Sequence, residues 1–141
     1  EFMPITFYSN KEGKLVKDDK AGISNSDGWW NSISSGDFDQ DGDLDYIIGN
    51  QGLNTQYKAS LKTPITVYAS DYDKNGSIDP IMTFYKEDKE VPIVVRDILH
   101  DQISTIMRKR FNTYTSYAQA TIKNVLTEKE IKDSKVLQHC F

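Results

Sequence analysis

The stretch GDFDQDGDLDYIIGN, residues 36–50, has an aspartate at every second position from Asp37 to Asp45 and then enters an apolar segment. Five like charges so close together repel one another unless something positive lies between them. A second copy of the pattern, DYDKNGSID at residues 71–79, begins 34 positions after DFDQDGDLD at residues 37–45. Both copies have an aromatic residue second, glycine sixth, an aliphatic residue eighth and aspartate ninth, which indicates an internal structural repeat.

The repeated pattern has the chemistry of a calcium loop. Calcium takes about six to eight oxygen ligands, and alternating side chains at positions 1, 3 and 5 converge from a turn that glycine at position 6 permits. A backbone carbonyl at position 7 and the carboxylate at position 9 complete the set. We therefore expect two Ca²⁺ sites, with these ligands: Asp37, Asp39, Asp41, Asp43 (carbonyl) and Asp45 in the first loop, and Asp71, Asp73, Asn75, Ser77 (carbonyl) and Asp79 in the second.

The loops differ from the helix–loop–helix EF-hand. That motif needs a bidentate glutamate at position 12, where this chain has Ile48 and Met82. The sequence instead predicts strand–loop–strand turns. Two alternatives stay open: Asp and Asn also form turns without any metal, and magnesium is a weaker candidate because it keeps its waters.

The charge distribution and the composition limit the classes of function that the chain can have. The two loops hold eight of the 21 acidic residues, while the rest of the chain has 13 acidic against 16 basic residues. This local acidity favours two cation sites, and the short basic run at 108–110 does not favour nucleic-acid binding. No stretch approaches the ~18 apolar residues of a membrane span. The single cysteine, Cys140, excludes an internal disulfide and a thiolate zinc site.

The hydrophobic pattern predicts an α+β fold of antiparallel β-hairpins followed by a C-terminal helical segment. Residues 3–95 form a β-rich region, because β-branched and aromatic segments alternate there with Gly, Asn and Asp turns. Residues 96–141 form a helical segment that ends in a possible strand, KVLQHCF. We expect Asp97 to cap one long helix, Tyr117–Leu126 to form a second, and the TEKE capping box at 127–130 to begin a third.

The N-terminal residues 1–2, Glu-Phe before Met3, are typical of a vector-derived addition, and the first ten residues lack the pattern of a signal peptide. The strand content amounts to about two blades of a propeller, whereas a closed propeller needs at least four. We therefore expect a compact α+β arrangement with the helices over one sheet face, or self-association that covers exposed sheet edges.

The segments GWWNSISSGDFDQDGDLDYIIGNQGLNTQYKAS (28–60) and VYASDYDKNGSIDPIMTFY (67–85) resemble FG-GAP/VCBS repeats, which build integrin α-like β-propellers. They are similar in particular to the VCBS-repeat surface proteins of Bacteroidetes that carry ASPIC/UnbV-type regions. The resemblance covers residues 28–95. It implies calcium in hairpin loops, hairpins of the propeller-blade type, and export to the periplasm, the cell surface or the medium, and it names no ligand.

Other candidate residues carry weaker signals. Trp29 and Trp30 could stack on a sugar, but a packing role is the commoner use of such residues. The adjacent pair His100 and Asp101 suggests a base and its orienting group, yet neighbours on a helix point apart. The pair His139 and Cys140 is weaker still. No nucleophile or phosphate-loop motif is present, so we predict no catalytic activity.

Two functional hypotheses follow. The chain is either a non-catalytic, calcium-binding surface module that binds glycan or protein in adhesion, or a scaffold segment of a larger secreted enzyme or transport-linked assembly. An exposed aromatic groove near Trp29 or Tyr57 would favour the first. Apolar faces left uncovered at 3–16 or 136–141 would favour the second, because they would mark where further strands dock.

Overall fold

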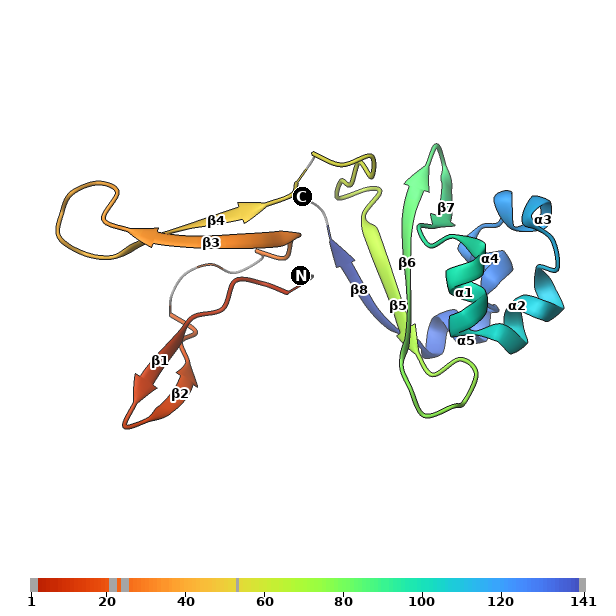
Figure 1. Cartoon of the computed structure of the whole chain (residues 1–141), viewed down its shortest axis with the longest axis horizontal. Coiled ribbons are helices and arrows are strands. Elements are labelled where there is room, and N and C mark those ends of the chain that lie inside the picture. Colours follow the sequence, from red (N-terminus) through yellow and green to blue (C-terminus); the bar gives the residue numbers. More distant parts are fainter. Residues whose placement is uncertain (1–2, 21–22, 24–25, 53, 140–141) are drawn as a thin grey trace. The chain divides into compact units, whose positions relative to one another are not determined.

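A computed structural model describes residues 3–20, 23, 26–52 and 54–139 of the chain (Figure 1). The described residues divide into two compact units, one up to Gln56 and the other over residues 57–139. The division expected from the sequence, at residue 95, separates strands from helices. The compact units instead follow packing, because the helices after residue 95 share a core with residues of the strands before it, Tyr68 and Ile81, and lie in the same unit.

The first unit consists of two antiparallel hairpins within its described residues. These are β1 (Tyr8–Lys11) with β2 (Lys14–Lys17), and β3 (Trp30–Gly36) with β4 (Asp45–Asn50). The turn between β1 and β2 contains Glu12 and Gly13 in the left-handed region, at φ 52° and 83°. Gly28 is the only buried residue among those described here, so neither hairpin has a hydrophobic core within this unit.

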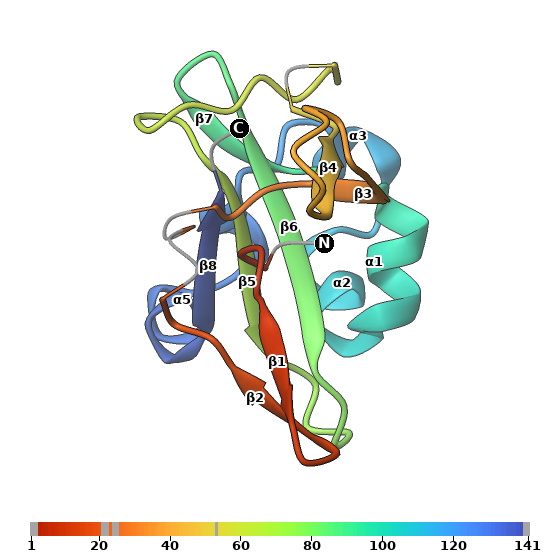
Figure 2. The ribbon, with the colours of Figure 1, turned by 90° about the vertical axis from the view of Figure 1, so that its left-hand side faces the viewer.

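The second unit contains a four-stranded antiparallel sheet in the order β7-β6-β5-β8. Figure 2 shows β6, β5 and β8 of this sheet side by side. Its strands are β5 (Ile65–Ser70), β6 (Asp79–Lys86), β7 (Lys89–Pro92) and β8 (Lys135–His139). The predicted C-terminal strand therefore exists, although Cys140 and Phe141 lie outside the described residues. β8 follows the helices in sequence and pairs with β5, with Ile65 opposite His139.

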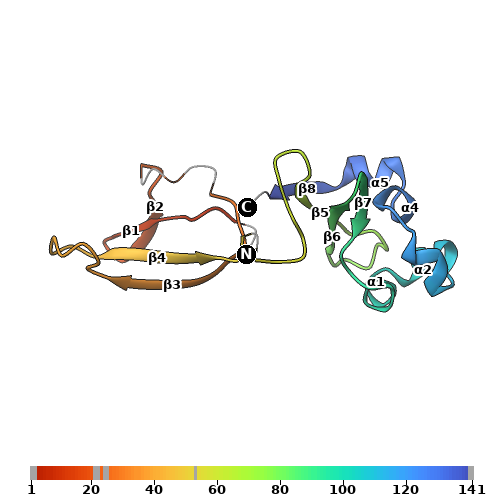
Figure 3. The same cartoon turned by 90° about the horizontal axis from the view of Figure 1, so that it is seen from above.

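Five short helices lie between β7 and β8, on one side of the sheet (Figure 3). They are α1 (Arg96–Gln102), α2 (Ser104–Arg110), α3 (Tyr114–Ala118), α4 (Ile122–Val125) and α5 (Glu128–Asp133). None of these helices, within the part of the chain that the structure describes, is long and apolar enough to cross a bilayer.

Two helix predictions were too long. The first helical stretch breaks at Ile103, a fully buried residue whose φ and ψ of −130° and 56° are not helical. The second stretch breaks between α3 and α4, where Ala120 is buried. Asp97 is not an N-cap: Val95 precedes the helix without a side-chain cap, and Asp97 lies in the first turn. The capping box of Thr127 and Glu130 is confirmed.

The core of the second unit forms between the helices and one face of the sheet. Tyr68 and Ile81 are cross-strand partners and share that face. They contact apolar residues of the helical segment: Leu99, Ile103, Ile106, Met107, Phe111, Ala120, Ile122, Val125 and Leu126. The α+β prediction, with helices over one sheet face, is confirmed in this unit.

The two repeats form hairpins with the same closing pair. Gly36 is opposite Asp45 in β3–β4, and Ser70 is opposite Asp79 in β5–β6. Each hairpin therefore carries its acidic loop at the same place, immediately beyond the last paired residues. The hairpins differ in what surrounds them, since β5–β6 has a strand on each edge and helices on one face, whereas β3–β4 forms a two-stranded sheet.

Candidate metal sites

The first acidic loop, residues 37–45, is held by its own carboxylates. Asp37 accepts hydrogen bonds from the backbone N–H groups of Asp41 and Gly42, both at 3.1 Å. Asp39 also accepts from the N–H of Asp41, at 3.2 Å. Asp45 reaches back to the N–H of Phe38 at 2.9 Å. These bonds bring the first, third and ninth positions toward one point inside the turn.

The second acidic loop, residues 71–79, repeats this arrangement bond for bond. Asp71 accepts from the N–H groups of Asn75 and Gly76 at 3.0 and 2.9 Å. Asp73 accepts from the N–H of Asn75 at 3.1 Å, and Asp79 accepts from the N–H of Tyr72 at 3.0 Å. The repeat seen in sequence is therefore also a repeat of local structure.

Glycine at the sixth position of each loop allows this turn. Gly42 and Gly76 have φ values of 96° and 90°, where a β carbon is strained. The fourth positions, Gln40 and Lys74, are also left-handed, at 64° and 63°. The same backbone path through two different sequences shows that the Asp and Gly positions, rather than their neighbours, determine the turn.

Three carboxylates converge in each loop. Asp37, Asp39 and Asp45 present oxygen atoms within 4.8 Å of one another, and so do Asp71, Asp73 and Asp79. Such spacing suits a cation bound at about 2.3–2.6 Å from several oxygens. The structure thus brings together positions 1, 3 and 9 of both predicted ligand sets.

The fifth and seventh positions have a different role in this structure. Asp41 and Asn75 accept from the N–H groups of Asp43 and Ser77 at 3.0 and 2.7 Å, respectively. Asp41 is not part of the converging carboxylate group, and Asp43 and Ser77 were expected to contribute only a carbonyl oxygen. A carboxylate or amide oxygen has two lone pairs, so these hydrogen bonds leave acceptor capacity for a cation.

The second loop is held more firmly than the first. The ring of Tyr72 packs against the core of the second unit, and its hydroxyl shares a 2.7 Å hydrogen bond with Ser134. Its counterpart Phe38 is 52% exposed. The aromatic second position therefore anchors one loop to a core and leaves the other loop supported by its hairpin alone.

Burial also distinguishes the ninth positions. Asp79 is only 3% exposed, and that burial, together with the charges of Asp73 and Asp71, raises the pKa of its carboxyl group. The ionised form of Asp79 is therefore costly when no cation is near. A divalent ion between the three carboxylates would offset that cost, which the turn hydrogen bonds alone do not.

No protein-family model, curated protein or solved structure matches the chain. The FG-GAP/VCBS resemblance therefore stays a prediction from the sequence. The case for the metal sites depends on the loops themselves: their matched sequences, matched hydrogen bonds and matched clusters of carboxylates.

The weaker candidates are placed as follows. Trp30 is half-buried and donates its indole N–H to the carbonyl of Ser26 at 2.7 Å, so this side chain has a structural role. Nδ1 of His100 is 3.9 Å from the exposed carboxylate of Asp101, too far for a hydrogen bond that would orient the ring. His139 is buried at the end of β8, and its neighbour Cys140 lies outside the described residues.

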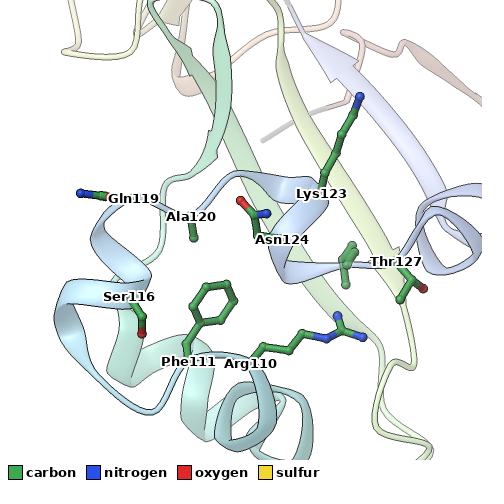
Figure 4. A pocket seen from close by; sticks show the side chains of 9 residues that line it. Arg110, Phe111, Ser116, Gln119, Ala120, Lys123, Asn124 and Thr127 are labelled. Atoms are coloured by element: carbon green, nitrogen blue, oxygen red, sulfur yellow. The ribbon is translucent and has the colours of Figure 1, made fainter.

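The basic run contributes a structural ion pair that the sequence did not predict. Arg110 contacts Glu130 at 3.3 Å and also the carbonyl of Val125, which ties α2 to α4 and α5. Arg110 borders a hollow of about 610 Å³ in which Lys123 and Gln119 point outward (Figure 4). Its lining includes hydroxyls, amides and two cations, but no carboxylate, histidine or cysteine that could act as a base.

A second cluster joins the start of α1 to α3. The hydroxyl of Tyr114 donates to Asp97 at 2.6 Å, and the guanidinium of Arg96 lies 5.0 Å from the centre of the Tyr114 ring. The hydrogen bond to Asp97 raises the pKa of Tyr114. Arg96 also donates twice to the carbonyl of Phe111, so its charge is already engaged in holding the helices. No local sequence pattern signals contacts between residues this far apart.

Proposed function

We propose that this chain is a non-catalytic, calcium-binding repeat module of an exported or cell-surface protein. Two Ca²⁺ ions, one in each acidic loop, hold the turns that join β3 to β4 and β5 to β6. The observation that carries the proposal is the duplicated geometry: three converging carboxylates at the same positions of two hairpins with the same closing pair.

Calcium suits these loops better than magnesium. The ligands are all hard oxygens from a flexible turn, and calcium accepts such irregular shells whereas magnesium demands a near-ideal octahedron. Extracellular calcium modules bind at about 10⁻⁴–10⁻³ M. That range suits the periplasm, the cell surface or the medium, where the proposal locates the protein, with a glycan or protein as the partner in adhesion.

A scaffold role in a larger assembly is the second candidate, and exposed apolar residues favour it. Met3, Tyr8 and Leu15 in the first unit are exposed, as are Val136 and Leu137 on β8. These residues lie in the segments 3–16 and 136–141, where uncovered apolar faces would mark the docking of further strands. Near Tyr57, by contrast, the ring packs edge-on against Phe84 at 4.9 Å and is used in packing.

The test is a calcium titration by calorimetry of the wild-type chain and of Asp39→Ala and Asp73→Ala. Asp88→Ala is the matched control, because it removes the same charge from the exposed β6–β7 turn. Two sites in the wild type and in the control, with one site lost in each loop variant, support the proposal. An absence of calcium heat in the wild type would show that the loops are acidic turns held by their own hydrogen bonds.

A further inference from the structure

The strands of the β3–β4 hairpin carry almost no charge. β3 contains no charged residue, and β4 contains one, Asp45, at its start. Every other edge strand in the described residues carries lysine: β1, β2, β7 and β8 each have at least one, and β7 also ends in proline. Lysine and proline are the usual means by which natural edge strands resist pairing with another chain. The hairpin β3–β4 lacks them.

The two edges of this hairpin are not equivalent. The pairing of β3 with β4 shifts register between Trp30 and Ser32, so β3 carries a bulge, which distorts an edge and discourages pairing. The chain of β4 is regular, and its YII run has high strand propensity. In the second repeat the strand equivalent to β4 is β6, and its outer edge is occupied by β7. The outer edge of β5 is likewise occupied, by β8, so β3–β4 lacks a strand at both edges, and of these two edges that of β4 is the one without a bulge.

We propose that the outer edge of β4 pairs antiparallel with β4 of a second copy of this chain, which joins two β3–β4 hairpins into one four-stranded sheet. A two-stranded hairpin alone is marginal in water, and independent stability needs three or more strands with an apolar face. The sheet so formed has the same number of strands as the one in the second unit.

The charges and side chains of β4 favour this occupant. A two-fold axis perpendicular to the sheet at Ile47 places Ile47 opposite Ile47 of the second copy, and Tyr46 opposite Ile48. Pairs of aromatic and β-branched residues are among the favourable cross-strand pairs. Asp45 then faces Gly49, so no like charges meet. The acidic loops lie at opposite ends of the new sheet, whereas a parallel arrangement would bring them together.

The exposed side chain at the centre makes the pairing testable. Ile47 is 56% exposed within its own hairpin, so a polar replacement does not disturb a core. Ile47→Lys places two lysines directly opposite each other across the proposed interface, which is unfavourable. The matched control is Ser34→Lys, because Ser34 is the partner of Ile47 on β3, on the same face but away from the β4 edge.

The experiment is sedimentation velocity of the full chain over a concentration series. The proposal predicts that the wild type and Ser34→Lys change from monomer to dimer as the concentration rises, and that Ile47→Lys stays monomeric. Ile47→Glu alone also stays monomeric, but a mixture of Ile47→Lys with Ile47→Glu regains the two-chain species, which a misfolded variant could not do. A wild type that stays at one chain throughout, or a mixture that fails to associate, would overturn the proposal.

Discussion

The hairpins β3–β4 and β5–β6 carry nearly the same loop in very different settings. Position for position, Ile47 in β4 corresponds to Ile81 in β6, yet Ile47 is 56% exposed and Ile81 is 0% exposed. The loops nevertheless have matching hydrogen bonds. The comparison shows that the loop is a local structure, specified by its Asp and Gly residues, whereas the stability of each hairpin comes from what covers it.

The side chains explain why only one hairpin is covered. The face of β5–β6 that packs on the helices contains Tyr68 and Thr83, and both bond to Glu90 of β7, Thr83 at 2.6 Å. The equivalent residues in β3–β4 are Ser34 and Gly49, which are too small to bury much apolar area. A β carbon at Gly49 would lie 2.5 Å from the hydroxyl of Ser32, so a larger residue there requires that hydroxyl to rotate away.

The largest expected difference between the hairpins is in the effect of truncating the matched isoleucines. Ile81→Ala removes a fully buried side chain between sheet and helices and should lower the free energy of unfolding by about 2–5 kcal/mol. Ile47→Ala removes an exposed one and should change it by about 0.5 kcal/mol or less. Urea denaturation followed by circular dichroism measures both. Equal losses would mean that β3–β4 has a cover that its exposure does not reveal.

Calcium should have the next largest effect on stability, and this effect should differ between the two units. At about 100 times the dissociation constant, a ligand that binds only the folded state stabilises it by ~2.7 kcal/mol. Because the second loop is joined to the core through Tyr72, this gain should raise the cooperative melting temperature of the second unit. Calorimetric melts in calcium and in chelator give the difference.

The two loop variants sharpen that comparison. Asp73→Ala should abolish the rise in the cooperative melt, and Asp39→Ala should leave it intact, since the first loop is attached to a hairpin without a core. If Asp39→Ala removed the rise instead, the first loop would contribute to the stability of the second unit, and the two hairpins would not be energetically independent.

The smallest effect concerns the helices that cover β5–β6. Burial opposes ionisation of Glu130, but hydrogen bonds from the N–H and hydroxyl of Thr127 and the charge of Arg110 prevail and lower its pKa. Because the pKa of Glu130 is lower in the folded state, its ionisation stabilises the fold at pH values above the unfolded pKa of about 4.3. This stabilisation is lost as the pH falls through the folded pKa. The melting temperature of the wild type should therefore fall further between pH ~6 and ~3 than that of Glu130→Gln. The same slope in both would assign the acid sensitivity to other carboxylates.

Much of the fold could be predicted because its signals are local. Alternating apolar residues and Gly or Asp turns located the strands, and the capping box at Thr127 located the start of α5. The breaks at Ile103 and before Ala120 could not be predicted, because the helical period continues through them and only the tertiary burial of these residues interrupts it. The division at Gln56 also depends on packing between distant segments.

The candidate sites follow the same rule. The convergence of Asp37, Asp39 and Asp45, and of their counterparts, follows from spacing within nine residues. The different burial of Asp79 and Asp45 depends on strands and helices far away in sequence, so the loops look equivalent in sequence and are not equivalent in structure.

The most direct test of calcium binding in both loops is a calcium titration followed by the amide resonances of Gly42 and Gly76. Each of these N–H groups donates to the first aspartate of its own loop, at 3.1 and 2.9 Å, so each reports on one site. We expect both resonances to shift and saturate, and we expect Asp39→Ala and Asp73→Ala each to abolish the shift only for the glycine of its own loop. If neither resonance moved up to about 10⁻² M calcium, well above the range of extracellular calcium modules, the loops would not be calcium sites.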